Sequence, residues 1–145
     1  MYTHILIPTD GSVLSDMAAR QGVAFAKSIN AKVTAITVSP PFHIFAADPV
    51  MVTDTREQYE KDCEVRAERY LGVVKEAAQT AGVPCEGLHT IDDHPYVAII
   101  DTARDKACDL IFMASHGRKG VSALVLGSET MKVLTHSKIP VLVCR

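Results

Sequence analysis

Short apolar runs alternate along the chain with longer segments in which apolar residues recur at helical spacing. The run His4 to Pro8 predicts a strand, and Thr9 to Ser12 after it are typical of a turn and a helix cap. The next spacing predicts an amphipathic helix from Val13 to Ile29, with this apolar stripe: Leu14, Ala18, Gly22, Phe25 and Ile29. Lys32 to Val38 predicts a second strand. A strand, a helix and a strand with short connections are typical of a parallel sheet with a right-handed crossover.

A long connection and a long helix follow. Ser39 to Thr53 contains three prolines and has no regular apolar period, so we expect a loop. It leaves the carboxyl end of the second strand, where such a loop can fold over a ligand. A helix is expected from about Asp54 to Ala81, ended by Gly82 and Pro84. Its apolar stripe consists of Tyr59, Cys63, Ala67, Tyr70, Leu71, Val74 and Ala78.

The same alternation continues to the end of the chain. Glu86 to Ile91 predicts a weaker strand, which we expect at a sheet edge, and a helix opens at Asp92 to Pro95 and runs through about Lys106. Three further elements follow, a strand, a helix and a last strand: Asp109 to Ala114, Gly127 to about His136, and Ile139 to Cys144. This alternation predicts an α/β fold, a three-layer α/β/α sandwich, in a single domain of residues 1–145.

The connection between the fourth strand and the last helix contains the strongest candidate chemistry. Ser115 to Leu126 is a small, basic loop that contains glycine and leads to Gly127 and Ser128 at the start of a helix. Backbone N–H groups at a helix N-terminus are unpaired, and the helix dipole favours negative charge there, so this arrangement indicates an anion site, most plausibly for phosphate. The basic side chains of the loop strengthen that interpretation: His116, Arg118 and Lys119. The sequence contains neither a P-loop motif nor a G-x-G-x-x-G dinucleotide fingerprint.

Composition narrows the classes of function. Hydrophobic residues make up 48% and charged residues 22% of the chain, and the net charge of −2 reflects 15 basic against 17 acidic side chains. The chain has no positive net charge that would attract nucleic acid or an anionic membrane, so we expect neither as a partner. The N-terminus has no pattern of a signal peptide and no run reaches transmembrane length, which predicts a cytoplasmic protein.

The four cysteines have no metal-ligand spacing. Cys63, Cys85, Cys108 and Cys144 are scattered, without a C-x-x-C motif or paired histidines at ligand spacing. We therefore expect small apolar fillers of the core and no metal site.

The glycine loop resembles the G-x2-G-x9-G-[ST] signature of the universal stress protein family. Gly117, the nine residues from Arg118 to Leu126, and Gly127 with Ser128 match its spacing, and Ala114 stands where the family has its first glycine. The resemblance extends over essentially the whole chain, from ILIPTDGS near the start to IPVLVCR at the end. It implies a five-stranded parallel sheet of order 3-2-1-4-5, the fold of the adenine nucleotide α-hydrolases, in the single-domain form of the family.

That strand order brings the first and fourth strands together, and ligands of such sheets sit where the order reverses. Asp10 and the segment from Ala114 to Gly117 should therefore face one crevice. The resemblance implies that Pro8, Thr9 and Asp10 lie beside the adenine and ribose of a nucleotide, with Val38 against the base. The resemblance implies that residues of the loop and of the start of the last helix contact the phosphates: Gly117, Arg118, Gly127, Ser128, Glu129 and Thr130. Three further residues of the implied site occupy the intervening positions: Met113, Ala114 and His116.

Other roles for these residues are open to test. Asp10 could act only as a helix cap, since aspartate is favoured at such turns. A phosphatase would need a second aspartate two residues on, where Ser12 stands. Ser115 and His116 are sequence neighbours whose side chains should point apart, so we expect no nucleophile and base pair and no catalytic residue.

The resemblance implies an adenine-nucleotide-binding stress protein that binds ATP or AMP, with Mg²⁺ accompanying ATP and at most slow hydrolysis. Two alternatives remain: an enzyme of the adenylating or flavin-binding type, and an interaction module that has lost nucleotide binding. Ile139 to Cys144 is an apolar strand at a sheet edge, which would aggregate unless something paired with it. In many members of the family the last strands of two subunits pair, which implies a homodimer through residues 139 to 144.

Overall fold

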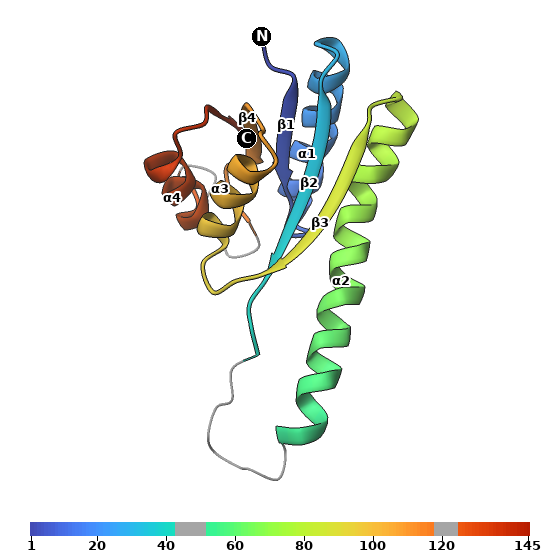
Figure 1. The fold of residues 1–145 in the computed structure, drawn as a ribbon, viewed down its shortest axis with the longest axis vertical. Coiled ribbons are helices and arrows are strands. Elements are labelled where there is room, and N and C mark those ends of the chain that lie inside the picture. The colour runs from blue at the N-terminus through green and yellow to red at the C-terminus, as the bar shows by residue number, and fades with distance from the viewer. Residues whose placement is uncertain (43–51, 118–124) are drawn as a thin grey trace.

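Five parallel strands form the centre of the computed structural model, in the order β3-β2-β1-β4-β5 (Figure 1). The structure describes residues 1–42, 52–117 and 125–145, with side chains in the second range from residue 56 onward. The strands are short and apolar, as their sequence runs predict: β1 (His4–Pro8), β2 (Lys32–Ser39), β3 (Cys85–Ile91), β4 (Leu110–Ala114) and β5 (Val141–Cys144). The strand order implied by the family resemblance is confirmed, and so is the edge position of β3.

Four helices of the described residues connect the strands: α1 (Val13–Ser28), α2 (Val52–Ala81), α3 (Pro95–Asp105) and α4 (Ser128–His136). Local signals set their ends. The Ser12 side chain accepts a hydrogen bond from the Ser15 N–H at 3.2 Å and caps α1. Pro95 occupies the first turn of α3, and Gly82, with φ of +70°, follows the last residue of α2. The predicted elements are therefore present, with ends shifted by two residues at most.

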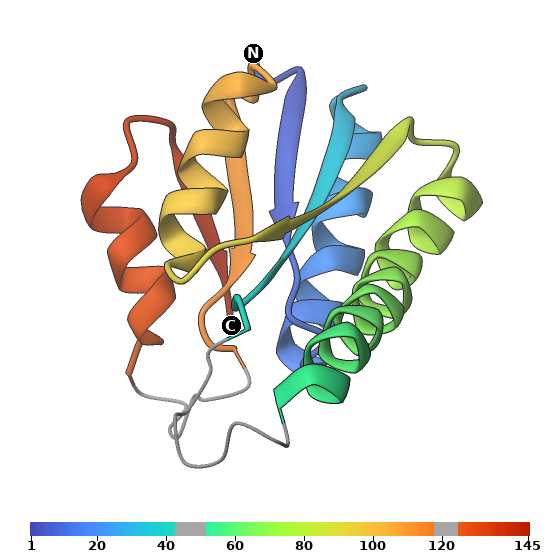
Figure 2. The same cartoon turned by 60° about the horizontal axis from the view of Figure 1, so that its bottom comes forward.

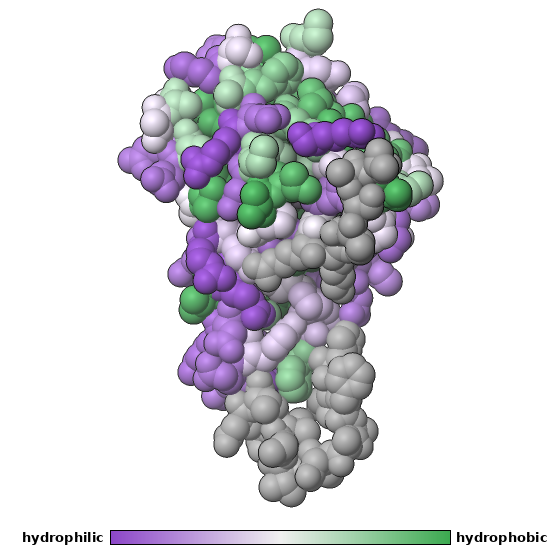
Figure 3. All heavy atoms as spheres, turned by 180° about the vertical axis from the view of Figure 1, so that it is seen from behind, coloured by the Kyte–Doolittle hydropathy of each residue, from purple (hydrophilic) through white to green (hydrophobic). Residues whose placement is uncertain are grey.

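Helices cover both faces of the sheet, so the fold is a sandwich of three layers, helix, sheet and helix (Figure 2). Side chains of α1 and α2 pack on one face in a cluster with Ile5, Ile7 and Phe112. Side chains of α3 and α4 pack on the other face with Leu6, Ile36 and Ile111. Alternate residues of β1 thus belong to opposite cores, which is the period of a strand buried on both faces. Seen from behind, apolar residues gather over the upper half of the molecule (Figure 3).

The apolar stripes of the two long helices compare differently with prediction. On α2 five of the seven predicted positions are buried, and Tyr59 and Tyr70 are half-buried. The buried five are Cys63, Ala67, Leu71, Val74 and Ala78. On α1 the buried face is rotated toward small residues, and Leu14, Phe25 and Ile29 are only half-buried. The residues buried there include Ala18, Ala19, Gly22, Val23 and Ala26.

The reason for this rotation is the short distance between α1 and the sheet. A Cβ at Gly22 would lie 2.8 Å from the Ile7 side chain, so only small residues let the helix approach this closely. None of the described helices is long and apolar enough to cross a bilayer.

Polar groups tie the strands together at the amino edge of the sheet. His4 on β1 is buried, and its Nε2 lies 2.7 Å from Thr34 Oγ1 on β2. The Asp109 carboxylate before β4 accepts hydrogen bonds from the Thr3 and His4 N–H groups at 2.8 and 3.0 Å. Burial, together with the nearby Lys32 charge, lowers the pKa of His4 below its ordinary value. Burial alone would raise the pKa of Asp109, but the hydrogen bonds from His4 and Thr3 lower it.

These pKa directions predict how stability depends on pH. Unfolded histidine has a pKa of about 6.5, so below that pH the unfolded chain binds a proton that folded His4 resists, and the folded state loses stability. The titration of Asp109 affects stability only at lower pH, because unfolded aspartate has a pKa of about 3.9. We expect the urea midpoint to fall between pH 7.5 and pH 5.5 by a larger amount in the parent than in His4→Gln, which cannot titrate. Equal falls in both proteins would show that His4 does not contribute.

Candidate functional site

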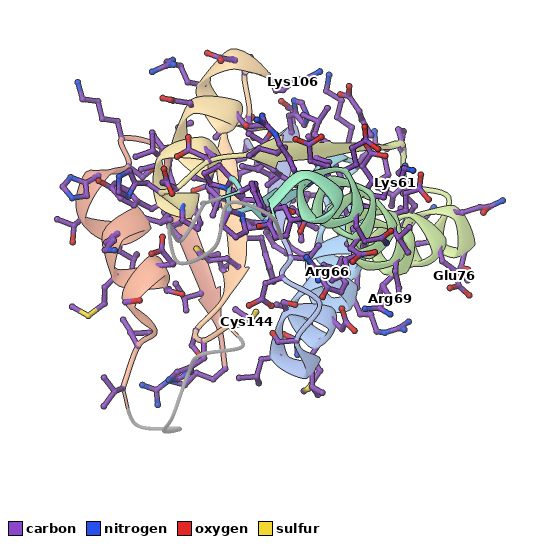
Figure 4. All side chains as sticks on the ribbon, turned by 90° about the horizontal axis from the view of Figure 1, so that it is seen from below. Lys61, Arg66, Arg69, Glu76, Lys106 and Cys144 are labelled. Carbon is purple, nitrogen blue, oxygen red and sulfur yellow. The ribbon has the colours of Figure 1, made fainter. Side chains whose placement is uncertain are left out.

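The carboxyl ends of β1 and β4 lie side by side in the middle of the sheet. Ile5 pairs with Leu110 and Leu6 with Ile111. The chain leaves β1 for α1 on one face and leaves β4 for α4 on the other, so the two connections separate at the place where doubly wound sheets are expected to hold a ligand. We call this place the crevice. Figure 4 views this edge from below, with Cys144 marking the end of β5.

The structure brings Asp10 and Gly117 into direct contact in this crevice. A Cβ at Gly117 would collide with Asp10 Oδ2, so only glycine lets the β4 loop approach the carboxylate this closely. The other oxygen, Oδ1, accepts the Ser12 N–H at 3.0 Å. The interpretation of Asp10 as the cap of α1 is wrong, because Ser12 is the N-cap residue. Asp10 stabilises the turn before the cap, and its second oxygen lies at the loop.

The other residues expected near the base and ribose lie at the carboxyl ends of β1 and β2. Thr9 is buried, and its Oγ1 lies 3.1 Å from Ser15 Oγ and accepts the Gly11 N–H at 3.3 Å, so the side chain is occupied at the start of α1. Pro8 is half-buried. Val38 near the end of β2 is also half-buried and packs against the core beneath α3 and α4.

On the β4 side, Met113 and Ala114 end the strand. Met113 is buried in the core on the α3 and α4 face, so its side chain is committed to packing. Ala114 is not among the described residues with positive φ, so its methyl group causes no backbone strain where the family has glycine. The Ala114 carbonyl accepts a hydrogen bond from Thr130 Oγ1 at 3.0 Å. Alanine is therefore compatible with this backbone.

Ser115 and His116 form a buried pair, contrary to the expectation that their side chains point apart. Ser115 Oγ lies 2.9 Å from His116 Nδ1, and both residues are buried. The chain bends at Ser115, directly after β4, so these two residues do not follow the alternation of the strand. The Ser115 carbonyl accepts the Gly127 N–H at 2.7 Å. His116 Nε2 is buried and has no hydrogen-bond partner among the described residues. A catalytic triad would place a carboxylate at the second ring nitrogen, and no described carboxylate holds it.

The start of α4 has no cap from its own N-cap residue. That residue is Gly127, and among the described residues no side chain caps the helix, so the first-turn N–H groups lack the partner that a serine or aspartate would supply. A Cβ at Gly127 would lie 3.2 Å from the Ser115 carbonyl oxygen and 3.3 Å from the His116 Cα, tighter than ordinary packing. Glycine therefore allows the helix start to contact the β4 loop.

Side chains of the first turn of α4 hold the helix in place. Glu129 accepts the Tyr96 N–H of α3 at 3.0 Å and forms an ion pair with Lys132 at 3.2 Å. Thr130 is buried and bonds to Ala114. Any contact of Glu129 and Thr130 with an anion at this turn would thus use the backbone. Ser128 is exposed, and Arg118 and Lys119 lie outside the described residues.

Other parts of the described chain offer little alternative chemistry. A hollow of about 190 Å³ lies beyond the ends of β2 and β3, lined by residues that include Pro40, Phe42, Tyr59 and Ile91, and the crevice residues take no part in it. The described residues contain no group of three side chains that could hold a metal ion. Burial raises the pKa of the Cys85 and Cys144 thiols and that of Cys108 to about 11, which disfavours reactive thiolates.

Comparisons with known proteins place this geometry in context. The family model described as "Universal stress protein family" matches residues 1–145. Universal stress protein MJ0531 of Methanocaldococcus jannaschii is 31% identical over 150 residues, which cover 100% of this chain and 83% of that protein. The solved structure of MJ0577 from the same organism has a TM-score of 0.81 at 26% identity and covers 99% of this chain and 95% of its own. A universal stress protein solved in complex with cAMP has a TM-score of 0.71 at 21% identity and covers 99% of this chain and 97% of its own.

The contact at Gly127 generates a prediction that needs no ligand. Gly127→Val places two methyl groups against the Ser115 carbonyl and the His116 backbone, so the helix start must move away from the β4 loop. We expect a loss of about 1–3 kcal/mol in the free energy of unfolding, which is typical of overpacking. Ala114→Gly is the control, because it removes a methyl group without crowding the loop. Chemical denaturation compares the two, and equal stability of Gly127→Val and the parent would contradict the close contact.

Proposed function

The chain belongs to the universal stress protein family, and on that premise we propose that it binds an adenine nucleotide in the crevice between β1 and β4. The observation that carries the proposal is the meeting of three groups there. They are the Asp10 carboxylate against Gly117, the uncapped N-terminus of α4, and the buried His116 Nε2, which lacks a partner among the described residues. Buried polar atoms without partners are rare, and a ligand can supply the missing hydrogen bonds.

Different crevice residues would contact different parts of the nucleotide. A carboxylate such as Asp10 accepts hydrogen bonds from the vicinal hydroxyls of a ribose, while Pro8, Thr9 and Val38 border the base. The N–H groups of the first turn of α4 suit the phosphates, because they are donors at the positive end of a helix dipole. The remaining members of the proposed site would lie between these parts or complete the phosphate contacts: Met113, Ala114, His116, Gly117, Arg118, Gly127, Ser128, Glu129 and Thr130.

We propose ATP or AMP as the ligand, with Mg²⁺ accompanying ATP as its counter-ion. The protein of the same fold that was solved with cAMP supports the adenine class. The basic residues Arg118 and Lys119 favour a polyphosphate.

The proposed role is binding rather than catalysis. Ser115 is buried and has no complete triad among the described residues, so the Ser115 and His116 pair favours no hydrolase. An adenylating or flavin-binding enzyme and a module without a nucleotide are the competing hypotheses, and native mass spectrometry of the purified protein separates the three. The four free cysteines suit a reducing compartment, so we further propose that the protein acts in the cytoplasm.

Asp10→Ala tests the proposed site. We expect ATP and AMP affinity to fall by more than about tenfold, because a hydrogen bond to a charged group contributes about 1.5–3 kcal/mol. Asp92→Ala is a matched control, since Asp92 Oδ1 accepts the His94 N–H at 2.8 Å in the same kind of turn, after the edge strand β3. Isothermal titration should give the control the affinity of the parent. Unchanged affinity in folded Asp10→Ala would leave Asp10 with only its turn-stabilising role.

We also propose a homodimer through the C-terminal strand. β5 is the last strand of the sheet, pairs within the described chain only with β4, and remains half-buried along its length. Met131 and Leu134 are exposed apolar residues of α4, the helix that precedes β5 in the chain. An antiparallel contact between two copies of β5 would satisfy the free edge and close after two subunits.

Val143→Asp tests the dimer. Leu142 packs against the core beneath α1 and α2, whereas Val143 belongs to neither core cluster, so a charge at Val143 disturbs the edge more than the fold. We expect the parent to sediment as a dimer and Val143→Asp as a monomer of about 16 kDa, as the chain mass of 15.7 kDa implies. Ile91→Asp, at an exposed apolar residue of the opposite edge strand, is the control and should remain dimeric. A monomeric parent, or a dimer in Val143→Asp, would contradict the interface.

A further inference from the structure

Tyr70 connects helix α2 to the turn that carries Asp10. Gly11, which follows Asp10, has φ of +75°, a conformation that favours glycine. A Cβ at Gly11 would collide with the Tyr70 ring, so the ring lies directly against the backbone of the turn. Tyr70 is 59 positions from Gly11 along the chain, and it is half-buried. Tyr70 is not part of the family signature on which the proposed site rests.

The turn lies between Tyr70 and the β4 loop. On one side the ring contacts Gly11, and on the other the Asp10 carboxylate contacts Gly117. Within the turn, the Gly11 N–H bonds to Thr9 Oγ1 at 3.3 Å and the Ser12 N–H to Asp10 Oδ1 at 3.0 Å. These two bonds restrain the peptide groups on either side of Gly11. The contact with the Tyr70 ring additionally limits displacement of the Gly11 Cα, the most adaptable point of the turn.

The surroundings of Tyr70 hold the ring in place. The Arg69 guanidinium lies 5.4 Å from the ring centroid, within the range of a cation–π interaction. Leu71 and Val74, on the same part of α2, are buried in the core against the sheet. Figure 4 labels Arg66 and Arg69 on this part of the helix. A firmly packed helix thus presents an aromatic ring to a glycine turn.

We propose that Tyr70 is a positioning residue for the nucleotide site: its ring fixes the Gly11 turn and thereby keeps the Asp10 carboxylate against Gly117. The inference rests on the proposed function, because the carboxylate it positions is the proposed ribose ligand. It adds a prediction that the crevice alone does not make. Affinity for the adenosine part of the ligand depends on α2, a helix outside the crevice.

The central experiment is a double-mutant cycle read by titration with ATP. Tyr70→Ala should weaken ATP binding by about three- to tenfold, in the range of coupling between residues in contact. Tyr70→Phe, which keeps the ring, should stay within about twofold of the parent. In an Asp10→Ala background, Tyr70→Ala should have no further effect, because its action passes through Asp10. Binding of inorganic triphosphate, which has no ribose, should be unchanged by Tyr70→Ala.

Val74→Ala separates positioning from simple destabilisation. Val74 is fully buried one turn further along α2 and contacts the core, so its truncation should lower stability by about 1–3 kcal/mol, as removal of buried methyl groups does. It should leave ATP affinity unchanged. Parent-like affinity in folded Tyr70→Ala, or effects of Tyr70→Ala and Asp10→Ala that simply add, would overturn the proposal. An equal loss of affinity in Val74→Ala would do the same.

Hydrogen exchange keeps this inference distinct from the proposed function. The amide of Ser12, which bonds to Asp10, should exchange faster in Tyr70→Ala than in the parent or in Val74→Ala. If the parent binds no nucleotide, the proposed function fails and so does the ligand role of Tyr70. Faster exchange of the Ser12 amide in Tyr70→Ala would then still show that the ring holds the Asp10 turn in place. Unchanged exchange would overturn this structural role as well.

Discussion

The pairing of β1 with β4 is the contact on which the candidate site depends. These strands are separated in the chain by two other strands and three helices, yet they lie side by side because the sheet is built outward from β1 in both directions. The connections after them turn to opposite faces, which parallel sheets require where the strand order reverses. The two loops at their carboxyl ends therefore meet without a helix between them. Asp10 faces Gly117 for this reason and not because of any sequence proximity.

Missing side chains make the close contacts of the site possible. Gly117 admits the Asp10 carboxylate, Gly127 admits the β4 loop to the start of α4, and Gly11 admits the ring of Tyr70. A methyl group would meet the Asp10 carboxylate at Gly117, backbone atoms at Gly127 and the Tyr70 ring at Gly11. The crevice is thus a place where backbone segments approach one another unusually closely. Backbone N–H groups that are brought together in this way suit a polar, charged ligand.

Most crevice side chains have structural partners, and the exceptions indicate where a ligand would interact. Thr9, Ser12, Glu129 and Thr130 all bond to neighbouring elements and hold the loops in place. By contrast, within the described part of the chain no side chain caps the first turn of α4 and no group pairs with His116 Nε2. A rigid frame around a few unsatisfied donors and acceptors is the arrangement that binds a ligand with little rearrangement.

The sequence by itself determined the type and position of the helices and strands, because apolar periodicity and turn residues act over a few neighbouring positions. Its glycine spacing also located the loop that meets α4, and the family resemblance supplied the strand order. Tertiary structure alone decided which residues cap and contact one another: Ser12 rather than Asp10 caps α1, Ser115 bonds to His116, and the small face of α1 turns to the sheet. The contact of Tyr70 with Gly11 could not be predicted from the sequence either, since periodicity identified Tyr70 only as part of the apolar stripe of α2. Periodicity reports which face of an element is buried, but the partner of that face is set by how distant backbones pack.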